Sequence, residues 1–512
     1  MKFLKAFSVI LFILIIHFMS LSTAYARAGG GHSSSSHSSS SRSSSSGSSS
    51  RRSYGYNTSR SRQTNYADNT IDSDIILIVL IILLLILIVV WYIEKNKPTI
   101  LINQHNIEIF DEAKLTAFKE HDPNFSRVLL LDFVQLLYAR YYQYYGKREF
   151  NFLNGFLEAS VRHDVELDRL INQQVIKVTE LVINAQRFYF IGADNNEETI
   201  GIEIYANYSI RPVFYTSQTA RQQTRYTVIE RWVLARQQGI VSLPPERMRA
   251  LLCPMCAAPA QFTDSGQCLA CHHVIHLGQV QWYVKQRQVT FQAIFENNDL
   301  VSYANETGTN LPSVISPVLN ENINLFSQKH TITWASYWLN FQNDIVRAYF
   351  MAFNNAWSEC QLENVRHILA DRLYETQLFW IQRYQENQWR NQLDNLMLNK
   401  IELVAMELDT YYESITVRLF ASCNDYTLDN NHHVIGGSKY KKRRYSEYWN
   451  FVRRSGVENS SSVFSLNQCP QCAAPADNMG QAGICGYCHC KISHGDFSWV
   501  LFAITQDEVY SL

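Results

Sequence analysis

The sequence predicts an α+β fold in which a layer of helices packs on a curved antiparallel sheet, and it predicts that this unit occurs twice. Apolar residues recur at three- and four-residue steps from residue 335 to 390, and beyond it they alternate with polar residues up to residue 453. The first spacing is typical of helices and the second of half-buried strands. Two pairs of cysteines lie at 253–271, and pairs with nearly the same spacing lie at 469–488. Helices followed by antiparallel strands form an α+β layer structure.

The first 26 residues have the pattern of a secretory signal peptide. Lys2 and Lys5 precede an apolar stretch from Ala6 to Phe18, and Ala24-Tyr25-Ala26 resembles a cleavage site with small residues. We therefore expect cleavage after Ala26. The alternative is an uncleaved first anchor.

Residues 27–74 are predicted to be a disordered linker. Serine dominates between His32 and Arg52. Small polar side chains cannot offset the entropic cost of ordering the backbone, so this segment cannot form a core of its own.

Residues 75–93, IILIVLIILLLILIVVWYI, are predicted to be a transmembrane helix. They contain no charge, and as a helix they extend about 28 Å, which matches the apolar thickness of a bilayer. If a cleaved signal precedes this span, everything after Glu94 is left in the cytosol. We expect a single-pass protein of the bacterial inner (cytoplasmic) membrane with cytosolic C-terminal domains.

The remainder of the chain repeats itself at an offset of 216 or 217 residues. The cysteine pairs at 253–271 and at 469–488, called here the first and second knuckle, are related in this way. The loop between the two pairs is one residue longer in the second knuckle. The relation extends to Glu230, Trp232, Gly278 and Trp282, which match Glu447, Trp449, Gly495 and Trp499 at 217. Self-similarity at this distance indicates two copies of one module, each a body followed by a cysteine knuckle.

The second copy shows the plan of the module most clearly. We expect amphipathic helices at 335–357 and at about 361–390, followed by strands around 401–405 and 415–421 and a last strand at 445–453. Turns are expected at 429–431 and at Gly436-Gly437. The apolar residues that carry these predictions are Trp338, Phe341, Ile345, Tyr349, Ala352, Ala356, Leu369, Leu373, Leu378, Ile381, Ile401, Leu403, Ala405, Ile415, Val417, Leu419 and Ala421.

The segments AFNNAWSECQLENVRHILADRLYE, ITVRLFASCNDYTLD and YSEYWNFVRRSG of the second copy resemble the bacterial branch of the Tim44-like family. That family is related to the membrane-associated scaffold of the mitochondrial import motor. The first copy resembles the family more loosely, through DPNF at 122–125 and the internal repeat. The resemblance implies a cone-shaped fold similar to nuclear transport factor two, with a pocket at the open end.

These observations divide the chain into seven predicted parts. The signal peptide (1–26), the linker (27–74) and the transmembrane helix (75–93) are followed by a first, divergent Tim44-like domain at 110–250 and a first zinc ribbon at 251–290. A second Tim44-like domain at 330–460 and a second zinc ribbon at 461–512 complete the chain.

Each knuckle contains two C-x-x-C pairs, a spacing that lets two tight turns offer four thiolates to one tetrahedral ion. We predict two structural zinc ions, and disulfide or redox use of the pairs is the alternative. His273 aligns with Cys490 beside the pairs, and either of them could join the metal shell. Cys360 and Cys423 are interpreted as small buried apolar residues. The predicted ligands are Cys253, Cys256, Cys268 and Cys271 in the first knuckle and Cys469, Cys472, Cys485 and Cys488 in the second.

The overall charge does not favour nucleic acid, because 45 basic residues face 46 acidic ones. The densest basic run is Lys439, Lys441, Lys442, Arg443 and Arg444, interrupted by Tyr440. It could contact anionic lipid or nucleic acid, or it could be a solvated strand edge. We rate nucleic acid as the weaker alternative.

An enzyme is a third alternative, since Tyr411, Tyr412 and Asp425 could face the pocket of such a cone. No nucleophile elbow, phosphate loop or dinucleotide motif occurs in the sequence. We expect instead a membrane-anchored scaffold that binds protein partners, in protein transport or membrane-protein assembly, because linked binding modules gain avidity.

Overall fold

The computed structural model of the chain describes residues 110–145 apart from 111, 151–163, 176–212 apart from 195, 223–301, 308–457, 468–476 and 479–511. The predicted signal peptide, linker and transmembrane helix lie outside the described residues. Among the helices that are described, none has the length and apolar character needed to cross a membrane.

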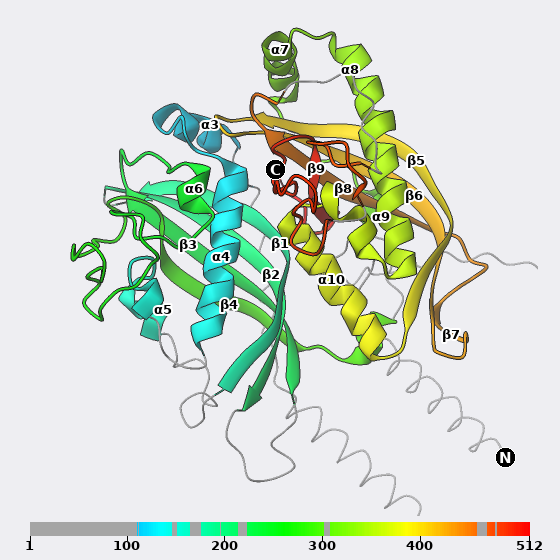
Figure 1. Cartoon of the computed structure of the whole chain (residues 1–512), viewed down its shortest axis with the longest axis horizontal. Coiled ribbons are helices and arrows are strands. Elements are labelled where there is room, and N and C mark those ends of the chain that lie inside the picture. The colour runs from blue at the N-terminus through cyan, green and yellow to red at the C-terminus, as the bar shows by residue number, and fades with distance from the viewer. Residues whose placement is uncertain are drawn as a thin grey trace, which may run out of the picture. The chain divides into compact units, whose positions relative to one another are not determined.

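The first body consists of helices on a four-stranded antiparallel sheet with the order β1-β2-β3-β4 (Figure 1). Long apolar runs form its central elements: ten residues of α4 are buried, and Ile200, Ile202 and Ile204 of β2 are fully buried on one face of the sheet. Its elements are α3 (Glu112–His121), α4 (Arg127–Tyr145), η1 (Asn151–Leu153), α5 (Ala159–His163), β1 (Ile176–Asp194), β2 (Glu197–Pro212), β3 (Thr224–Gln237), α6 (Pro245–Met248) and β4 (Tyr283–Ile294).

The second body repeats this arrangement with the sheet order β5-β6-β8-β9, and the short strand β7 pairs with β6. Short helices η3 (Asn297–Leu300) and η4 (Gly308–Asn310) lie between the bodies in the sequence. The elements of the second body are α7 (Leu319–His330), α8 (Trp334–Asn340), η5 (Phe341–Arg347), α9 (Ala348–Glu359), η6 (Leu362–Ile368), α10 (Asp371–Glu386), β5 (Arg390–Leu408), β6 (Tyr412–Leu428), β7 (Val434–Gly437), β8 (Arg443–Arg454) and β9 (Val500–Gln506).

The helix predicted at 335–357 is present as a continuous rod made of α8, a π-helical segment η5 and α9. It ends at Cys360, whose φ of 55° lies in the left-handed region. The buried side chains Tyr349, Phe353 and Trp357 recur at four-residue steps and face the apolar side of the second sheet. The predicted strands at 401–405, 415–421 and 445–453 lie within β5, β6 and β8.

The second predicted helix, at 361–390, is wrong as one continuous element. It divides into η6 and α10, because Leu369 and Ala370 leave the helix and pair with the outer strand β9. Leu369 forms a parallel bridge with Leu501, and the N–H of Ala370 donates to the carbonyl of Leu501 at 2.9 Å. The first body contains the same contact, since the N–H of Glu158 donates to the carbonyl of Val284 at 2.9 Å.

The knuckles do not simply follow their bodies. Each knuckle lies between the third strand of a sheet and the outer strand that completes it: β3 pairs with β4 across the first knuckle, and β8 pairs with β9 across the second. The predicted turn at Gly436-Gly437 also differs, since both glycines belong to β7 and pair with Thr427 and Tyr426.

One of the contacts between the two bodies is made by α10. Its side chains meet the outer strand β1 of the first sheet: the Thr376 hydroxyl donates to the Ile183 carbonyl at 2.8 Å, and the Trp380 indole N–H donates to Asn184 at 3.2 Å. These contacts give hydrogen-bond partners to a backbone carbonyl and a side-chain oxygen on the outer strand of the first sheet.

Candidate metal centres

The four cysteines of each predicted knuckle lie together, and their sulfur atoms are all within 4.8 Å of one another. In the first knuckle Cys253 Sγ is 3.9 Å from Cys271 Sγ, and Cys256 Sγ is 4.0 Å from Cys268 Sγ. In the second, the matching distances are 3.9 Å for Cys469 with Cys488 and 3.8 Å for Cys472 with Cys485.

These distances fit a tetrahedral ion. Four sulfurs bound to zinc at about 2.3 Å are separated by about 3.8 Å along each edge of the tetrahedron. All eight cysteines are free thiols in the structure. Both clusters could therefore hold a metal ion, and zinc is the ion that four thiolates in this geometry favour.

Matching backbone turns build the two clusters. The N–H of Cys253 donates to the carbonyl of Ala258 at 2.7 Å, and the N–H of Cys469 donates to that of Ala474 at the same distance. Ala257 and Ala473 occupy the left-handed region, with φ of 61° and 57°. Because residues other than glycine rarely adopt this conformation, its occurrence at the same place in both knuckles points to a turn required by the cluster.

Backbone N–H groups prepare one thiol of each cluster for metal binding. Burial alone raises the pKa of Cys268, but hydrogen bonds from the N–H groups of Cys271 and Ala270 lower it to about 7. The pKa of Cys485 is about 7 for the same reasons. Burial raises the pKa of Cys253 and of Cys469 to about 12, so these thiols lose their protons chiefly to a bound metal.

His273 and Cys490 lie beside the clusters and are not part of either four-sulfur group. The imidazole Nδ1 of His273 is 3.2 Å from the carbonyl oxygen of Cys271. The neighbouring His272 and His489 both have a φ of 58°, so these histidines occupy the left-handed position of the second C-x-x-C turn.

An arginine at the end of the third strand fixes each knuckle to its sheet. The guanidinium carbon of Arg236 is 4.3 Å from the ring centre of Trp282, and its Nε is 2.9 Å from Glu198. In the second body Arg453 is 4.6 Å from the ring of Trp499, and its Nε is 2.7 Å from Glu413. Both carboxylate-arginine pairs are buried.

The sequence analysis missed these ion pairs. Arg236 and Arg453 are related by the offset of 217, and Glu198 and Glu413 by an offset of 215. The offset of 217 that relates Trp232 to Trp449 also relates the two arginines and could have found them, whereas the glutamates lie at a different offset and carry no such signal.

The matched residues Glu230 and Glu447 also have the same role in both bodies. The indole N–H of Trp232 donates to Glu230 at 3.0 Å, and that of Trp449 donates to Glu447 at 3.1 Å. In the first body Glu230 is fully buried and also binds Tyr138, Tyr142 and Arg287. A polar network centred on Glu230 therefore lies within the largely apolar core of the first body.

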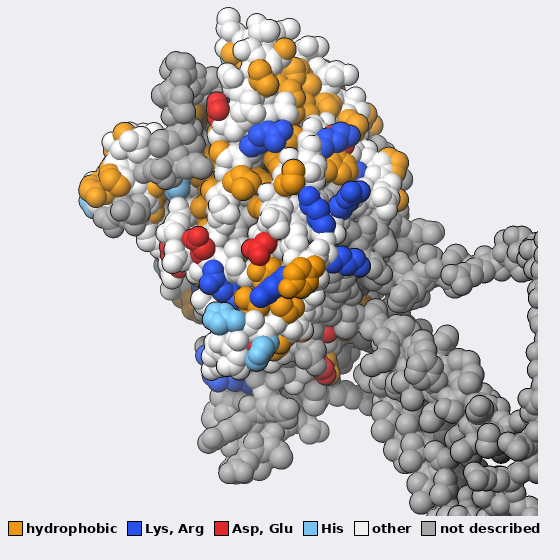
Figure 2. All heavy atoms as spheres, turned by 90° about the vertical axis from the view of Figure 1, so that its right-hand side faces the viewer, with side chains coloured by type: hydrophobic (Ala, Val, Ile, Leu, Met, Phe, Trp, Pro, Cys, Tyr) orange, Lys and Arg blue, Asp and Glu red, His pale blue; other side chains and the backbone are white. Residues whose placement is uncertain are grey.

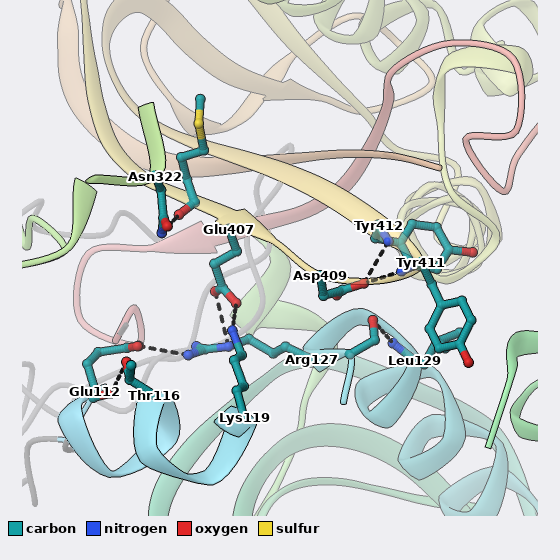
Figure 3. Close-up of polar contacts among 12 residues, drawn as sticks. Glu112, Thr116, Lys119, Arg127, Leu129, Asn322, Glu407, Asp409, Tyr411 and Tyr412 are labelled. Atoms are coloured by element: carbon teal, nitrogen blue, oxygen red, sulfur yellow. Dashed lines mark hydrogen bonds and ion pairs between the residues drawn. The ribbon is translucent and has the colours of Figure 1, made fainter. Parts of the chain in front are cut away.

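The three candidate pocket residues do not come together. Tyr411 and Tyr412 follow the turn between β5 and β6, where their N–H groups donate to Asp409 at 2.7 Å (Figure 3). Asp425 lies near the other end of β6, about 40 Å away along an extended strand. There it is paired with Arg443 and accepts a hydrogen bond from Asn391 at 2.8 Å.

The turn between β5 and β6, next to Tyr411 and Tyr412, lies where the two bodies contact each other. Arg127 of α4 and Lys119 of α3 are 3.1 Å and 3.2 Å from Glu407 of β5 (Figure 3). Although burial opposes ionisation, these cations hold the pKa of Glu407 below its usual value. Burial raises the pKa of Asp409 to about 6.

The basic residues at 439–444 do not form one continuous exposed surface. Arg443 is paired with Asp425 and mostly buried, whereas the side chain of Tyr440 is 93% exposed. Lys442 Nζ lies 3.5 Å from the sulfur of Met397, which is itself exposed. Figure 2 shows basic and apolar side chains interspersed on the side of the molecule where β5, β6 and β7 lie in Figure 1.

The fold and the clusters together define an α+β protein with two antiparallel sheets and two four-cysteine clusters. A family model described as Tim44-like domain matches residues 340–469, about a quarter of the chain. The match runs from the end of α8 through β8 to the first cysteine of the second cluster. No curated protein and no solved structure matches the chain.

Proposed function

We propose that the protein is a membrane-anchored scaffold whose cytosolic bodies bind protein partners during protein transport or membrane-protein assembly. The observation that carries this proposal is the Tim44-like domain at residues 340–469, which fits a scaffold or adaptor role in protein transport. The anchor in this proposal is the apolar stretch at 75–93.

The first body is proposed to be a second, diverged copy of the same domain. Support comes from the equal sheet orders, the matched turns of the cysteine clusters and the arginine-tryptophan contacts at the same offset. In this proposal both bodies have the cone-shaped fold of nuclear transport factor two. Two linked binding bodies engage a partner more tightly than either body alone.

The metal clusters serve the scaffold as structural zinc sites in this proposal. Four thiolates complete the shell of a zinc ion and leave no open position for a substrate, so the ions fix the knuckles without taking part in chemistry. Lys439, Lys441, Lys442 and Arg444 are proposed to add contacts with anionic lipid, while Arg443 is occupied by Asp425.

In-cell photocrosslinking tests the scaffold role. A photoreactive residue is placed at Met351 or at Met397, whose side chains are 41% and 53% exposed on the second body. Val241, 41% exposed, is the corresponding test position on the first body. We expect crosslinks to transport components or to membrane-inserting polypeptides from both bodies, and the chain without a photoreactive residue is the control.

Recovery of RNA in place of protein from the same crosslinked cells would contradict the scaffold role. Nucleic-acid binding is the second candidate function, and the exposed lysines beside Tyr440 are the observation that favours it. Such binding would weaken steeply with increasing salt concentration.

A further inference from the structure

A cleft of about 410 Å³ lies between the two bodies and is separate from both cysteine clusters. Its walls are α4 of the first body and the first turn of α10 in the second, with Phe502 of β9 and His494 beyond the second cluster. This volume lies within the range of small-molecule sites, and such sites occur preferentially where domains meet.

Two arginines in the cleft have donors without acceptors. Arg249 Nε is 3.5 Å from Asp132 Oδ2, and Arg372 Nη1 is 3.9 Å from Asp132 Oδ1. Both nitrogens are buried, and within the described part of the chain neither makes a hydrogen bond. Separations of this length are too long for direct hydrogen bonds, so one carboxylate attracts both guanidinium groups without satisfying either of them.

The rest of each side chain is held in place. Arg372 Nη2 donates to Gln186 at 2.6 Å, and the guanidinium carbon is 4.4 Å from the ring centre of Phe502. The guanidinium carbon of Arg249 is 5.3 Å from the ring centre of Tyr412. The two donors are therefore positioned in advance, as a binding site for a planar or tetrahedral oxyanion requires.

Guanidinium groups outnumber the uncompensated carboxylates that line the cleft, so the cleft attracts an anion. Asp371 is compensated elsewhere, because Arg366, Lys491 and Ser493 all contact its carboxylate. Arg140 and Glu375 also line the cleft, so three guanidinium groups face the carboxylates of Asp132 and Glu375. The first turn of α10 has no side-chain cap, and the positive end of its dipole adds to the attraction.

We propose that this cleft binds a small oxyanion, a phosphate monoester or a carboxylate, whose oxygens accept hydrogen bonds from Arg249 Nε and Arg372 Nη1. Because Arg249 belongs to the first body and Arg372 to the second, the bound anion ties the bodies together. This site goes beyond the scaffold role and does not depend on it.

The test uses the full chain in detergent, with inorganic phosphate and succinate as separate probes and sodium chloride at matched ionic strength as the reference. Titration calorimetry and thermal unfolding measure binding. We expect saturable binding of at least one probe, and the probe that binds more tightly identifies the class of anion. Arg372→Gln and Arg249→Gln are each expected to weaken binding about tenfold. Arg231→Gln is the control, since Arg231 is similarly buried but pairs with Glu203 outside the cleft.

Two further variants separate binding from folding. Arg372→Lys keeps the charge but not the planar fork, so it is expected to bind more weakly than the wild type and better than Arg372→Gln. Asp132→Asn removes the competing carboxylate and is expected to tighten anion binding several-fold. Its melting temperature should fall without the probe and recover with it.

The proposal is overturned if neither probe binds the wild type or Asp132→Asn beyond the chloride reference. It is also overturned if Asp132→Asn weakens binding of both probes, since an anion held beside Asp132 should bind more tightly once that negative charge is removed. These measurements use purified protein without partners, so their failure leaves the scaffold role untouched.

Discussion

Cys268 and its seven counterparts are the residues whose replacement has the most specific expected consequence. Cys268→Ser leaves three thiolates in the first cluster, and a hydroxyl is a much weaker zinc ligand. We expect the purified chain to hold one zinc ion in place of two, measured by mass spectrometry of the metal. The control is Cys490→Ser, because Cys490 lies beside the second cluster but outside its four sulfurs. Loss of an ion in that control would place Cys490 in the metal shell.

Arg453 is a second residue whose replacement is expected to have a large effect, here on the stability of the fold. Arg453→Met leaves the buried Glu413 carboxylate with Lys329 and His330 as its cationic neighbours in the described part of the chain. Removing one partner of a buried pair costs about 3 kcal/mol of the free energy of unfolding. Urea denaturation at pH 7 measures this loss. The neighbour Arg454→Met is the control, since Arg454 is more exposed and is 3.4 Å from Asp496; we expect it to cost less than about 1 kcal/mol.

The same ion pair predicts a pH dependence. Burial opposes ionisation of Glu413, yet Arg453 and the neighbouring donors hold its pKa below the usual value. An acid with a lowered pKa in the folded state stabilises the protein above its unfolded pKa, near 4.3, and loses this contribution as pH falls through the folded pKa. Arg453→Met should therefore reduce the loss of stability below pH 4.3. An unchanged acid profile in this variant would contradict the assignment.

At the scale of elements, the position of the knuckles within the sheets has a measurable consequence. Each knuckle joins the third strand to the outer strand, so the metal cluster should hold β4 and β9 on their sheets. Chelation is expected to speed amide hydrogen exchange in β4 and β9 first and to leave β2 and β6 protected. Exchange followed by mass spectrometry measures this order. Simultaneous loss of protection in all strands would show that each body unfolds as one unit with its knuckle.

Elements with local signals could be predicted from the sequence. The spacing of Phe341, Ile345 and Tyr349 is set by one helix face, and the C-x-x-C pairs form their turns within a few residues. The break at Leu369 and Ala370 could not be predicted in this way, because it depends on the hydrogen bond from the N–H of Ala370 to the carbonyl of Leu501, 131 positions later. For the same reason the sequence did not reveal that β4 and β9 return to the sheets.

The residues of the candidate sites also differ in whether a local sequence pattern predicts them. All eight cysteines of the two clusters were predicted, since their spacing carries the geometry of a tetrahedral ion. Arg249, Arg372 and Asp132 of the cleft between the bodies were not, because they come from three separate segments and no short motif relates them. Their proximity depends on how the two bodies pack.

At the scale of the whole molecule, the contacts between the bodies include two that lie on opposite sides of the seam. Glu407 binds Arg127 and Lys119 on one side, and α10 binds the edge of β1 on the other. The cleft with the unsatisfied arginines lies along this same seam, lined by α4 and α10. An anion bound there would therefore strengthen an existing contact between the bodies.

The orientation of the chain in the membrane is the last prediction. If the signal peptide is cleaved and residues 75–93 span the inner membrane, the serine-rich linker lies outside the cytosol and both bodies lie inside it. The eight cluster thiols favour this orientation, because thiolates persist in a reducing compartment and are lost to disulfides in an oxidising one. Tyr440→Cys places a thiol at a side chain that is 93% exposed on the second body, and Ser45→Cys places one in the linker. A maleimide that cannot cross the membrane should label Ser45→Cys in spheroplasts. Tyr440→Cys should gain label over the wild-type chain, which has exposed thiols of its own at Cys256 and Cys472, only after the membrane is permeabilised. Labelling of Tyr440→Cys in sealed spheroplasts would place the clusters outside the cytosol and remove the basis for a cytosolic scaffold.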